Sequence, residues 1–131
     1  MAEYLRQRVA AAIKKRADPV APNGAMMSRY AFRLRIKPGK EAEYDESHRH
    51  VWPALLAKLK EVGVSHYSIF RREQDLVLVM EVDNFDAAWD ALAKDETNLK
   101  WQQKMAPIFD AVPGIKPAER FAMMEEVFYL E

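Results

Sequence analysis

Tyr44 and His48 are the two residues of this sequence best suited to proton transfer. They lie four positions apart in a helical pattern, which places their side chains one above the other on a single helix face. Histidine changes its charge near neutral pH, and a tyrosine hydroxyl can donate or accept a hydrogen bond beside it. The pair predicts an acid–base site, although the same pattern fits two residues of a core or of a dimer interface.

Trp101 and Gln102 form a second candidate group, to which Tyr67 adds another aromatic hydroxyl. An indole face beside an amide suits a carbohydrate, because the C–H faces of a sugar stack on aromatic rings while its hydroxyls form hydrogen bonds. The helical spacing of Trp101 and Met105 fits core packing equally well. These residue types therefore permit a pocket for a small molecule but do not establish one.

A metal site would have to use His48 and His50. Two residues apart on a helix, their side chains diverge by about 200°, so they are poor ligands for one ion. The sequence contains no cysteine, which excludes disulfides, thiolate nucleophiles, zinc fingers and iron–sulfur clusters. It also lacks a glycine-rich phosphate loop and a nucleophile elbow. From these residues alone we expect no metal site.

The composition indicates the class of protein to which these residues belong. Its 131 residues correspond to about one domain, and 50% are hydrophobic. Twenty Lys and Arg balance twenty Asp and Glu, which argues against binding to nucleic acid or to an anionic membrane. No apolar run reaches the ~18 residues of a membrane span, and no signal peptide is recognised. The sequence predicts a soluble, cytoplasmic protein.

Two regions differ in pattern along the chain. Residues 1–27 read as an N-terminal extension, with a short basic amphipathic helix before Asp18-Pro19 and a linker over 19–24. Such a helix could lie on a membrane or on a partner, or could be a loosely docked appendage. Residues 28–131 carry the sharper signals and are predicted to form the functional domain.

The elements of this domain follow from hydrophobic periodicity. Strands are predicted over 30–37, where apolar and polar residues alternate, over 64–71, over 76–82, whose continuous apolar run is typical of a central strand, and over 123–130. Helices are predicted over 44–62, from an N-cap at Asn84 onward and over about 96–110. Pro53 should kink or break the first helix near residues 50–52, because an interior proline removes a hydrogen bond and clashes with the preceding turn.

This order of elements predicts an α+β fold of the ferredoxin-like type. Two β-α-β halves with right-handed crossovers give a four-stranded antiparallel sheet with its helices on one face. The other face then needs a cover, and a two-fold homodimer would supply one. A polar open face bearing Arg33 and Arg35 could instead remain in contact with water.

Four collinear segments carry a family resemblance. Residues 43–55 match the pattern Tyr-x-x-x-His-x-x-[Ile/Val]-Trp-Pro-x-Leu, and residues 63–70, 100–105 and 125–130 supply the other three matches. Together they span about residues 29–131. The sequence resembles the L-rhamnose mutarotase family, which also includes mutarotases assigned to L-fucose.

The resemblance implies a dimeric α/β barrel of ferredoxin-like subunits that needs no metal or organic cofactor. It implies an isomerase that interconverts the α and β anomers of a 6-deoxyhexose by acid–base ring opening. By this resemblance, His48 is the proton donor and Tyr44 orients the sugar or relays a proton. Tyr44, Tyr67, Trp101 and Gln102 would contact the substrate.

Two departures from the family pattern concern the sugar. Gln102 stands where some rhamnose enzymes have a second tryptophan, and residues 111–121 replace an Asn-Pro-rich loop. The sequence therefore does not choose between L-rhamnose and L-fucose, which differ only in hydroxyl stereochemistry. Two other classes stay open: a dimeric ferredoxin-like oxygenase or haem-handling protein, and a sugar-binding module without catalysis.

Overall fold

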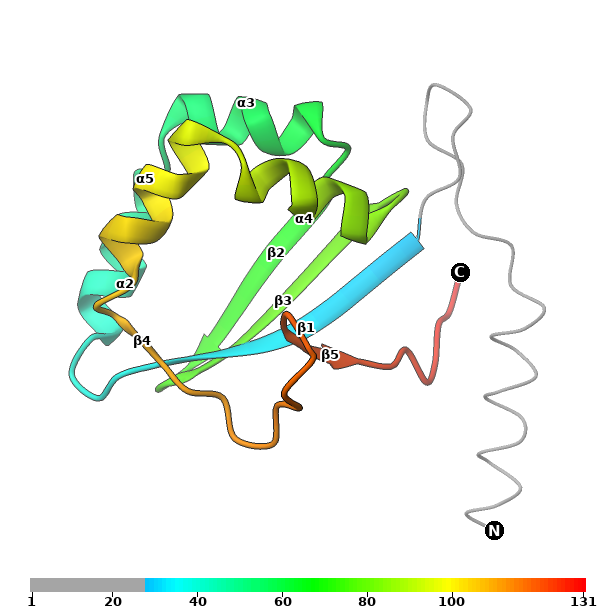
Figure 1. The fold of residues 1–131 in the computed structure, drawn as a ribbon. Helices are drawn as coiled ribbons and strands as arrows, with labels where there is room; N and C mark the ends of the chain where they lie inside the picture. The colour runs from blue at the N-terminus through cyan, green and yellow to red at the C-terminus, as the bar shows by residue number, and fades with distance from the viewer. Residues whose placement is uncertain (1–27) are drawn as a thin grey trace, which may run out of the picture.

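An antiparallel sheet and four helices make up residues 28–131, which are the residues that the computed structural model describes (Figure 1). The elements are β1 (Ser28–Ile36), α2 (Glu41–Arg49), α3 (Pro53–Glu61), β2 (Ser65–Arg72), β3 (Asp75–Val82), α4 (Phe85–Ala93), α5 (Glu96–Met105), β4 (Phe109–Asp110) and β5 (Ala122–Met124). The helix and linker predicted within residues 1–27 lie outside the described residues.

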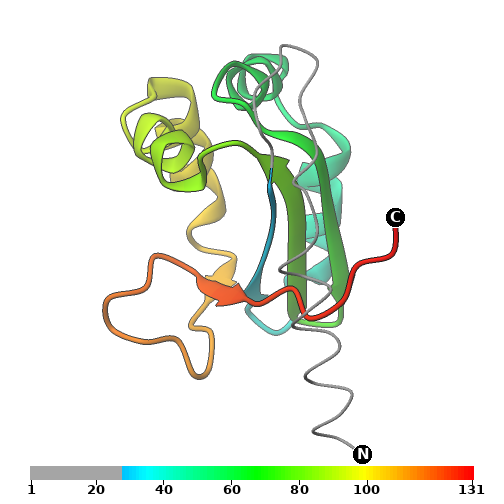
Figure 2. The same cartoon turned by 90° about the vertical axis from the view of Figure 1, so that its right-hand side faces the viewer.

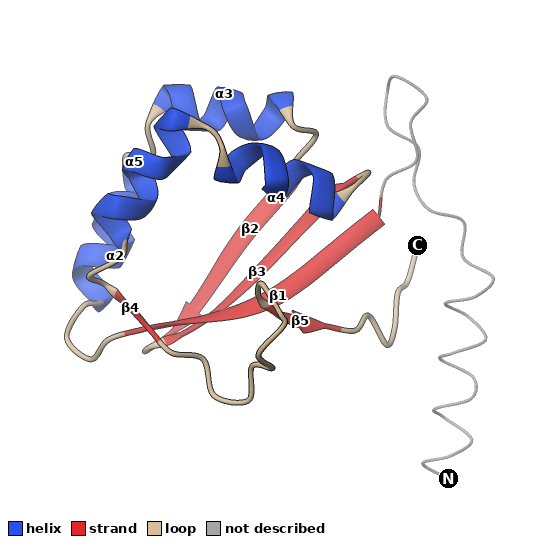
Figure 3. Cartoon of the chain, viewed as in Figure 1, coloured by secondary structure: helices blue, strands red, loops and turns tan. Residues whose placement is uncertain are grey.

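The sheet confirms the predicted α+β, ferredoxin-like topology. Its strand order is β2-β3-β1-β4, and β5 also pairs with β1. All of these pairings are antiparallel. Two short segments, β4 and β5, thus lie beside β1 where the sequence predicted one last strand, and a loop separates them (Figure 3).

Two predicted boundaries were wrong. Helix α5 ends at Met105 and not at Asp110, because Pro107 has no N–H to continue the helical hydrogen bonds. Strand β5 spans Ala122–Met124 and thus includes only the first two residues of the strand predicted over 123–130. Since Ala31 pairs with Met124, an extended strand would run past the first residue of β1 by residue 128.

The core lies between the sheet and the helices. Strand β1 alternates as predicted, and its inward Phe32 pairs with Leu78 of β3. Strand β3, predicted from its continuous apolar run to be a central strand, lies between β2 and β1 and buries every second residue. The most deeply buried large side chains are Phe32, Ile36, Leu76, Met80, Val82 and Met105. Figure 1 shows the four helices gathered along one side of the sheet. No helix within residues 28–131 has the length and hydropathy of a membrane span.

The predicted break at Pro53 is confirmed and divides the first helix into α2 and α3. Pro53 begins α3. The N–H of the first residue of a helix has no partner within the helix, so a proline there costs no hydrogen bond. The predicted cap of α4 is confirmed as well, since the Asn84 side chain accepts a hydrogen bond of 3.0 Å from the backbone N–H of Ala87. The break matters for function because it leaves Tyr44 and His48 on a short helix of their own.

The sheet face away from the helices mixes apolar and charged residues. Val77 lies between Arg33 on β1 and Phe70 on β2, and the Phe70 side chain is 63% exposed. After β4 the chain forms a loop that projects from the body of the protein (Figure 2). The end of that loop returns Phe121 to stack on Phe32, with ring centroids 4.3 Å apart.

Candidate active site

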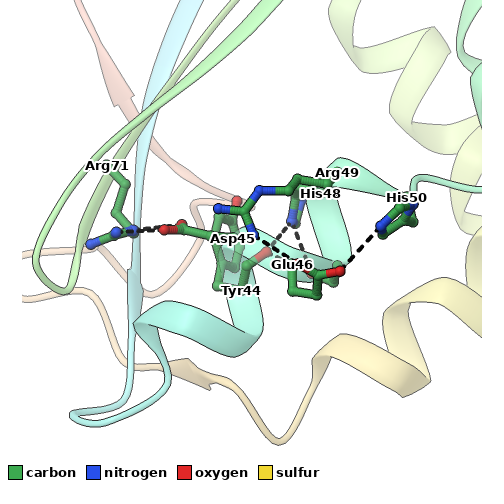
Figure 4. Close-up of polar contacts among 8 residues, drawn as sticks. Tyr44, Asp45, Glu46, His48, Arg49, His50 and Arg71 are labelled. Carbon is green, nitrogen blue, oxygen red and sulfur yellow. Dashed lines mark hydrogen bonds and ion pairs between the residues drawn. The ribbon is translucent and has the colours of Figure 1, made fainter.

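His48 lies directly against Tyr44 on α2. Their ring centroids are 4.1 Å apart and the ring planes are inclined by 27°. The Nδ1 atom of His48 lies 3.0 Å from the backbone carbonyl oxygen of Tyr44 (Figure 4). The i, i+4 spacing predicted the contact between the two side chains, and the backbone contact fixes the orientation of the imidazole.

This contact also determines which ring nitrogen is free. A carbonyl oxygen only accepts hydrogen bonds, so Nδ1 carries the hydrogen and donates it. In the neutral imidazole, Nε2 then keeps its lone pair. Ser47 completes the arrangement, because its hydroxyl lies 3.1 Å from Nδ1 and donates to the same carbonyl at 2.7 Å.

Two tryptophans form an aromatic wall beside the imidazole. The His48 and Trp101 rings meet edge to face at 5.7 Å, and Trp101 meets Trp52 in the same way at 5.1 Å. The Nζ atom of Lys104 lies 5.2 Å from the Trp101 ring and 5.6 Å from the Trp52 ring. Trp101 is only 6% exposed, so it belongs both to the core and to this wall.

The electrostatic environment keeps His48 neutral. Its half-buried position lowers the pKa of the imidazole most strongly, because burial disfavours the charged form. The ammonium of Lys104 lowers this pKa further, while the Tyr44 carbonyl and the Asp45 carboxylate oppose the shift. The resting group is therefore a neutral histidine with a basic Nε2 atom.

The two tyrosines predicted for the site remain protonated phenols. Burial raises the pKa of Tyr44, which is 3% exposed, and Asp45 adds to the shift. Burial likewise raises the pKa of Tyr67, with a smaller contribution from Tyr44. Each phenol can therefore donate a hydrogen bond at neutral pH.

The other predicted residues are more peripheral. Gln102 is exposed, and its amide contacts only Asn98, at 3.5 Å, among the residues that the structure describes. His50 is the C-cap residue of α2, and its side chain turns away from His48 and lies 3.1 Å from Glu46 (Figure 4). Within residues 28–131, no three His, Asp or Glu side chains gather as metal ligands would.

Sequence reasoning missed Ser47, Lys104 and an ion pair between Asp45 and Arg71. Both guanidinium contacts of that pair are short, at 2.7 Å from Nε and 2.6 Å from Nη2 (Figure 4). Ser47 and Asp45 could have been suspected from their places beside His48 and Tyr44. The partnership with Arg71 joins positions 26 residues apart, and no local pattern signals it.

The fold and the site together define a class: a ferredoxin-like protein with a half-buried histidine set among aromatic rings. A family model described as L-rhamnose mutarotase matches residues 29–130. The chain belongs to the L-rhamnose mutarotase family and is a sugar isomerase.

Individual relatives support this assignment. The L-rhamnose mutarotases of Klebsiella pneumoniae and Yersinia pestis are 34% and 36% identical to this chain, over 79% and 80% of it and 99% and 100% of their own lengths. The crystal structure of an L-rhamnose mutarotase from Formosa agariphila matches with a TM-score of 0.64 at 35% identity, covering 79% of this chain and 99% of that one. Tetracenomycin F2 cyclase from Streptomyces glaucescens shares the fold alone, with a TM-score of 0.52 at 13% identity.

Proposed function

We propose that this enzyme interconverts the α and β anomers of a 6-deoxyhexose, L-rhamnose or L-fucose, with His48 as the proton-transferring group. The observation that carries the proposal is the contact between His48 Nδ1 and the Tyr44 carbonyl, which leaves Nε2 free to exchange a proton. Mutarotation needs no redox step, and an acid–base group of this kind accelerates a reaction by about 10²–10⁴-fold.

The reaction follows from this state of His48. Nε2 takes the proton of the anomeric hydroxyl, C1 and that oxygen form a carbonyl, and the bond from C1 to the ring oxygen breaks. The bonding pair goes to the ring oxygen, and the imidazolium then donates its Nε2 proton there. Rotation about C1–C2 and reversal of these steps closes the ring to either anomer. His48 is thus the donor to the ring oxygen and obtains its proton from the substrate.

The sugar lies against the free edge of His48 in this proposal. The Tyr44 and His48 rings are in contact, so no sugar fits between them. Tyr44 orients the substrate or relays a proton, Tyr67 and Gln102 hold hydroxyls, and Trp101 contributes the accessible edge of its indole. The Lys104 side chain extends over that indole and borders the same surface.

The choice of sugar is tested by measuring anomer exchange directly. Saturation-transfer NMR on L-rhamnose, L-fucose and further deoxyhexoses should show exchange above the buffer rate for at least one of them. Gln102, in place of an aromatic residue, supports a sugar other than L-rhamnose. Binding without accelerated exchange would instead favour a sugar-binding module, and the absence of both would overturn the proposal.

We also propose a homodimer that covers the open face of the sheet. Large apolar side chains are exposed on this face and on the C-terminal segment that follows β5, notably Phe70, Val127 and Phe128 at 63–66%. Monomeric proteins rarely leave a large apolar patch in contact with water.

Residues 28–131 would form the catalytic unit and 1–27 an extension to it, and a cysteine-free sugar isomerase of this kind suits the cytoplasm.

A further inference from the structure

Helix α2 carries the catalytic pair but has little else to hold it in place. It contains nine residues, its first turn has no side-chain cap, and Tyr44 is its one buried residue. Helices shorter than about 12–15 residues are marginal in water without tertiary support. The break at residues 50–52 also separates it from α3. The orientation of Tyr44 and His48 therefore needs support from outside the helix.

The Asp45–Arg71 pair supplies such support. Its two parallel hydrogen bonds are bidentate, the geometry in which a guanidinium fixes both the distance and the angle of a carboxylate. Arg71 is itself fixed, because its Nη1 atom donates to the carbonyl of Glu73 at 3.0 Å. Among residues 28–131, this is the only ion pair that joins α2 to another element, since the pairs of Glu43 and Glu46 stay within α2 and its flanking residues.

We propose that Asp45 and Arg71 are positioning residues, whose ion pair anchors α2 to β2 so that the Tyr44–His48 pair is held against Trp101 of α5. The proposal rests on the proposed function, because it assigns the pair a role in the reaction of His48. Asp45 adjoins Tyr44 in sequence and precedes His48 by less than one helical turn, so a shift of its carboxylate moves both side chains. Neither Asp45 nor Arg71 needs to touch the sugar.

The pair also contributes to the charge that His48 experiences. The charged groups that act on the imidazole are Asp45, from its own helix, and Lys104, from α5, with opposite effects on its pKa. The Arg71 guanidinium holds the pKa of Asp45 below its ordinary value and partly neutralises that carboxylate. Loss of Asp45 should lower the pKa of His48, whereas loss of Arg71 should raise it.

We call the Asp45–Arg71 ion pair the clamp. The test compares three clamp variants, Asp45→Asn, Arg71→Gln and the double variant, with two matched controls. Glu46→Gln breaks an ion pair of equal length on the same helix, and Arg72→Gln removes a cation from the same strand. Each single clamp variant should lower kcat about tenfold or more, since a displacement of about 1 Å in an active site can cost 10²-fold. The double variant should be no slower than the slower single variant, and the controls should stay within twofold of the wild type.

Two further readouts separate positioning from a general loss of structure. The His48 Cε1–H resonance, shifted by the Tyr44 and Trp101 rings, should move in both clamp variants and stay unchanged in the controls. The pH midpoint of kcat/KM should fall in Asp45→Asn and rise in Arg71→Gln. Arg71→Lys keeps the charge without the bidentate geometry and should recover part of kcat. It replaces Arg71→Gln in the comparison if that variant does not fold.

Clamp variants with wild-type kcat, or with an unmoved His48 resonance, would overturn the proposal. The resonance is measured without sugar, so it tests the clamp even if the wild-type chain exchanges no anomers. Failure of the clamp and failure of the proposed function are therefore distinguishable.

Discussion

His48 Nδ1 lies 3.0 Å from the carbonyl oxygen of Tyr44, one helical turn earlier. The tautomer of a histidine is set by the hydrogen bond that one ring nitrogen makes, often to a backbone carbonyl or a carboxylate. Here the backbone of the same helix performs that role, so the tautomer depends on the integrity of α2. In the proposed reaction, this contact makes Nε2 the nitrogen that exchanges a proton with the sugar.

Replacement of His48 should abolish catalysis without unfolding the protein. His48→Ala removes the proton-transferring atom, and we expect the enzyme-catalysed exchange to fall by about 10²–10⁴-fold. Saturation-transfer NMR measures the exchange, and circular dichroism follows the fold. His50→Ala is the matched control, because His50 lies two residues away and is 75% exposed against Glu46. Equal losses in the two variants would contradict the assignment.

The pH dependence of the reaction should reveal the neutral form of His48. Burial and Lys104 lower its pKa, so the neutral imidazole persists below histidine's ordinary value of about 6.5. Because Nε2 must accept a proton from the sugar, kcat/KM should be constant near neutral pH and decline as the pH falls through this lowered pKa. A rate that instead declines as the pH rises through the same range would show that the imidazolium is the resting form.

Tyr44→Phe separates the hydroxyl of Tyr44 from its ring. The phenylalanine keeps the stacking on His48 and the buried volume, so the change in unfolding free energy should stay within about 1.5 kcal/mol. If the hydroxyl relays a proton, kcat should fall by about tenfold or more, whereas an orienting hydroxyl would mainly raise KM. A variant with wild-type kcat and KM would remove Tyr44 from the reaction and leave it a structural role.

Much of the fold was predictable because its signals are local. Alternation in β1, the central strand β3, the cap at Asn84 and the break at Pro53 each depend on a few neighbouring residues, and all are confirmed. The predicted end of α5 was wrong because Ile108 and Phe109 continue the helical spacing of apolar residues, whereas Pro107 prevents the helix from continuing. The residues after Met124 keep the apolar pattern of a strand, but an extended strand there would run past the first residue of β1.

The site was predictable only in part, for a related reason. Tyr44 and His48 share one helix, so their contact follows from spacing, and Trp101 was placed beside them by the family pattern. The contacts of Lys104 and Arg71 with this region depend on how α5 and β2 pack against α2 in three dimensions. Charge interactions between distant elements leave no periodic trace in a sequence.

Gln102 should affect the recognition of the sugar more than the chemical step. Its exposed amide has one weak contact within the described residues, to Asn98, and is available to a substrate hydroxyl. Loss of one such hydrogen bond costs about 1 kcal/mol, so Gln102→Ala should raise KM by about fivefold while kcat changes little. Gln103→Ala, the exposed neighbour, is the control. If both variants behave as the wild type, Gln102 does not contact the sugar.

The open face of the sheet should decide the oligomeric state. Phe70 projects from β2 on this face beside Val77, and 63% of its surface is exposed in one copy of the chain. Phe70→Lys places a charge where a second copy would bury the ring, so sedimentation should show a shift from dimer to monomer. Leu56→Lys on α3, where the leucine is 47% exposed, adds the same charge on the helical side and should leave the dimer intact. A wild-type chain that sediments as a monomer would refute the interface directly, and a dimer lost only in Leu56→Lys would place it on the helices instead.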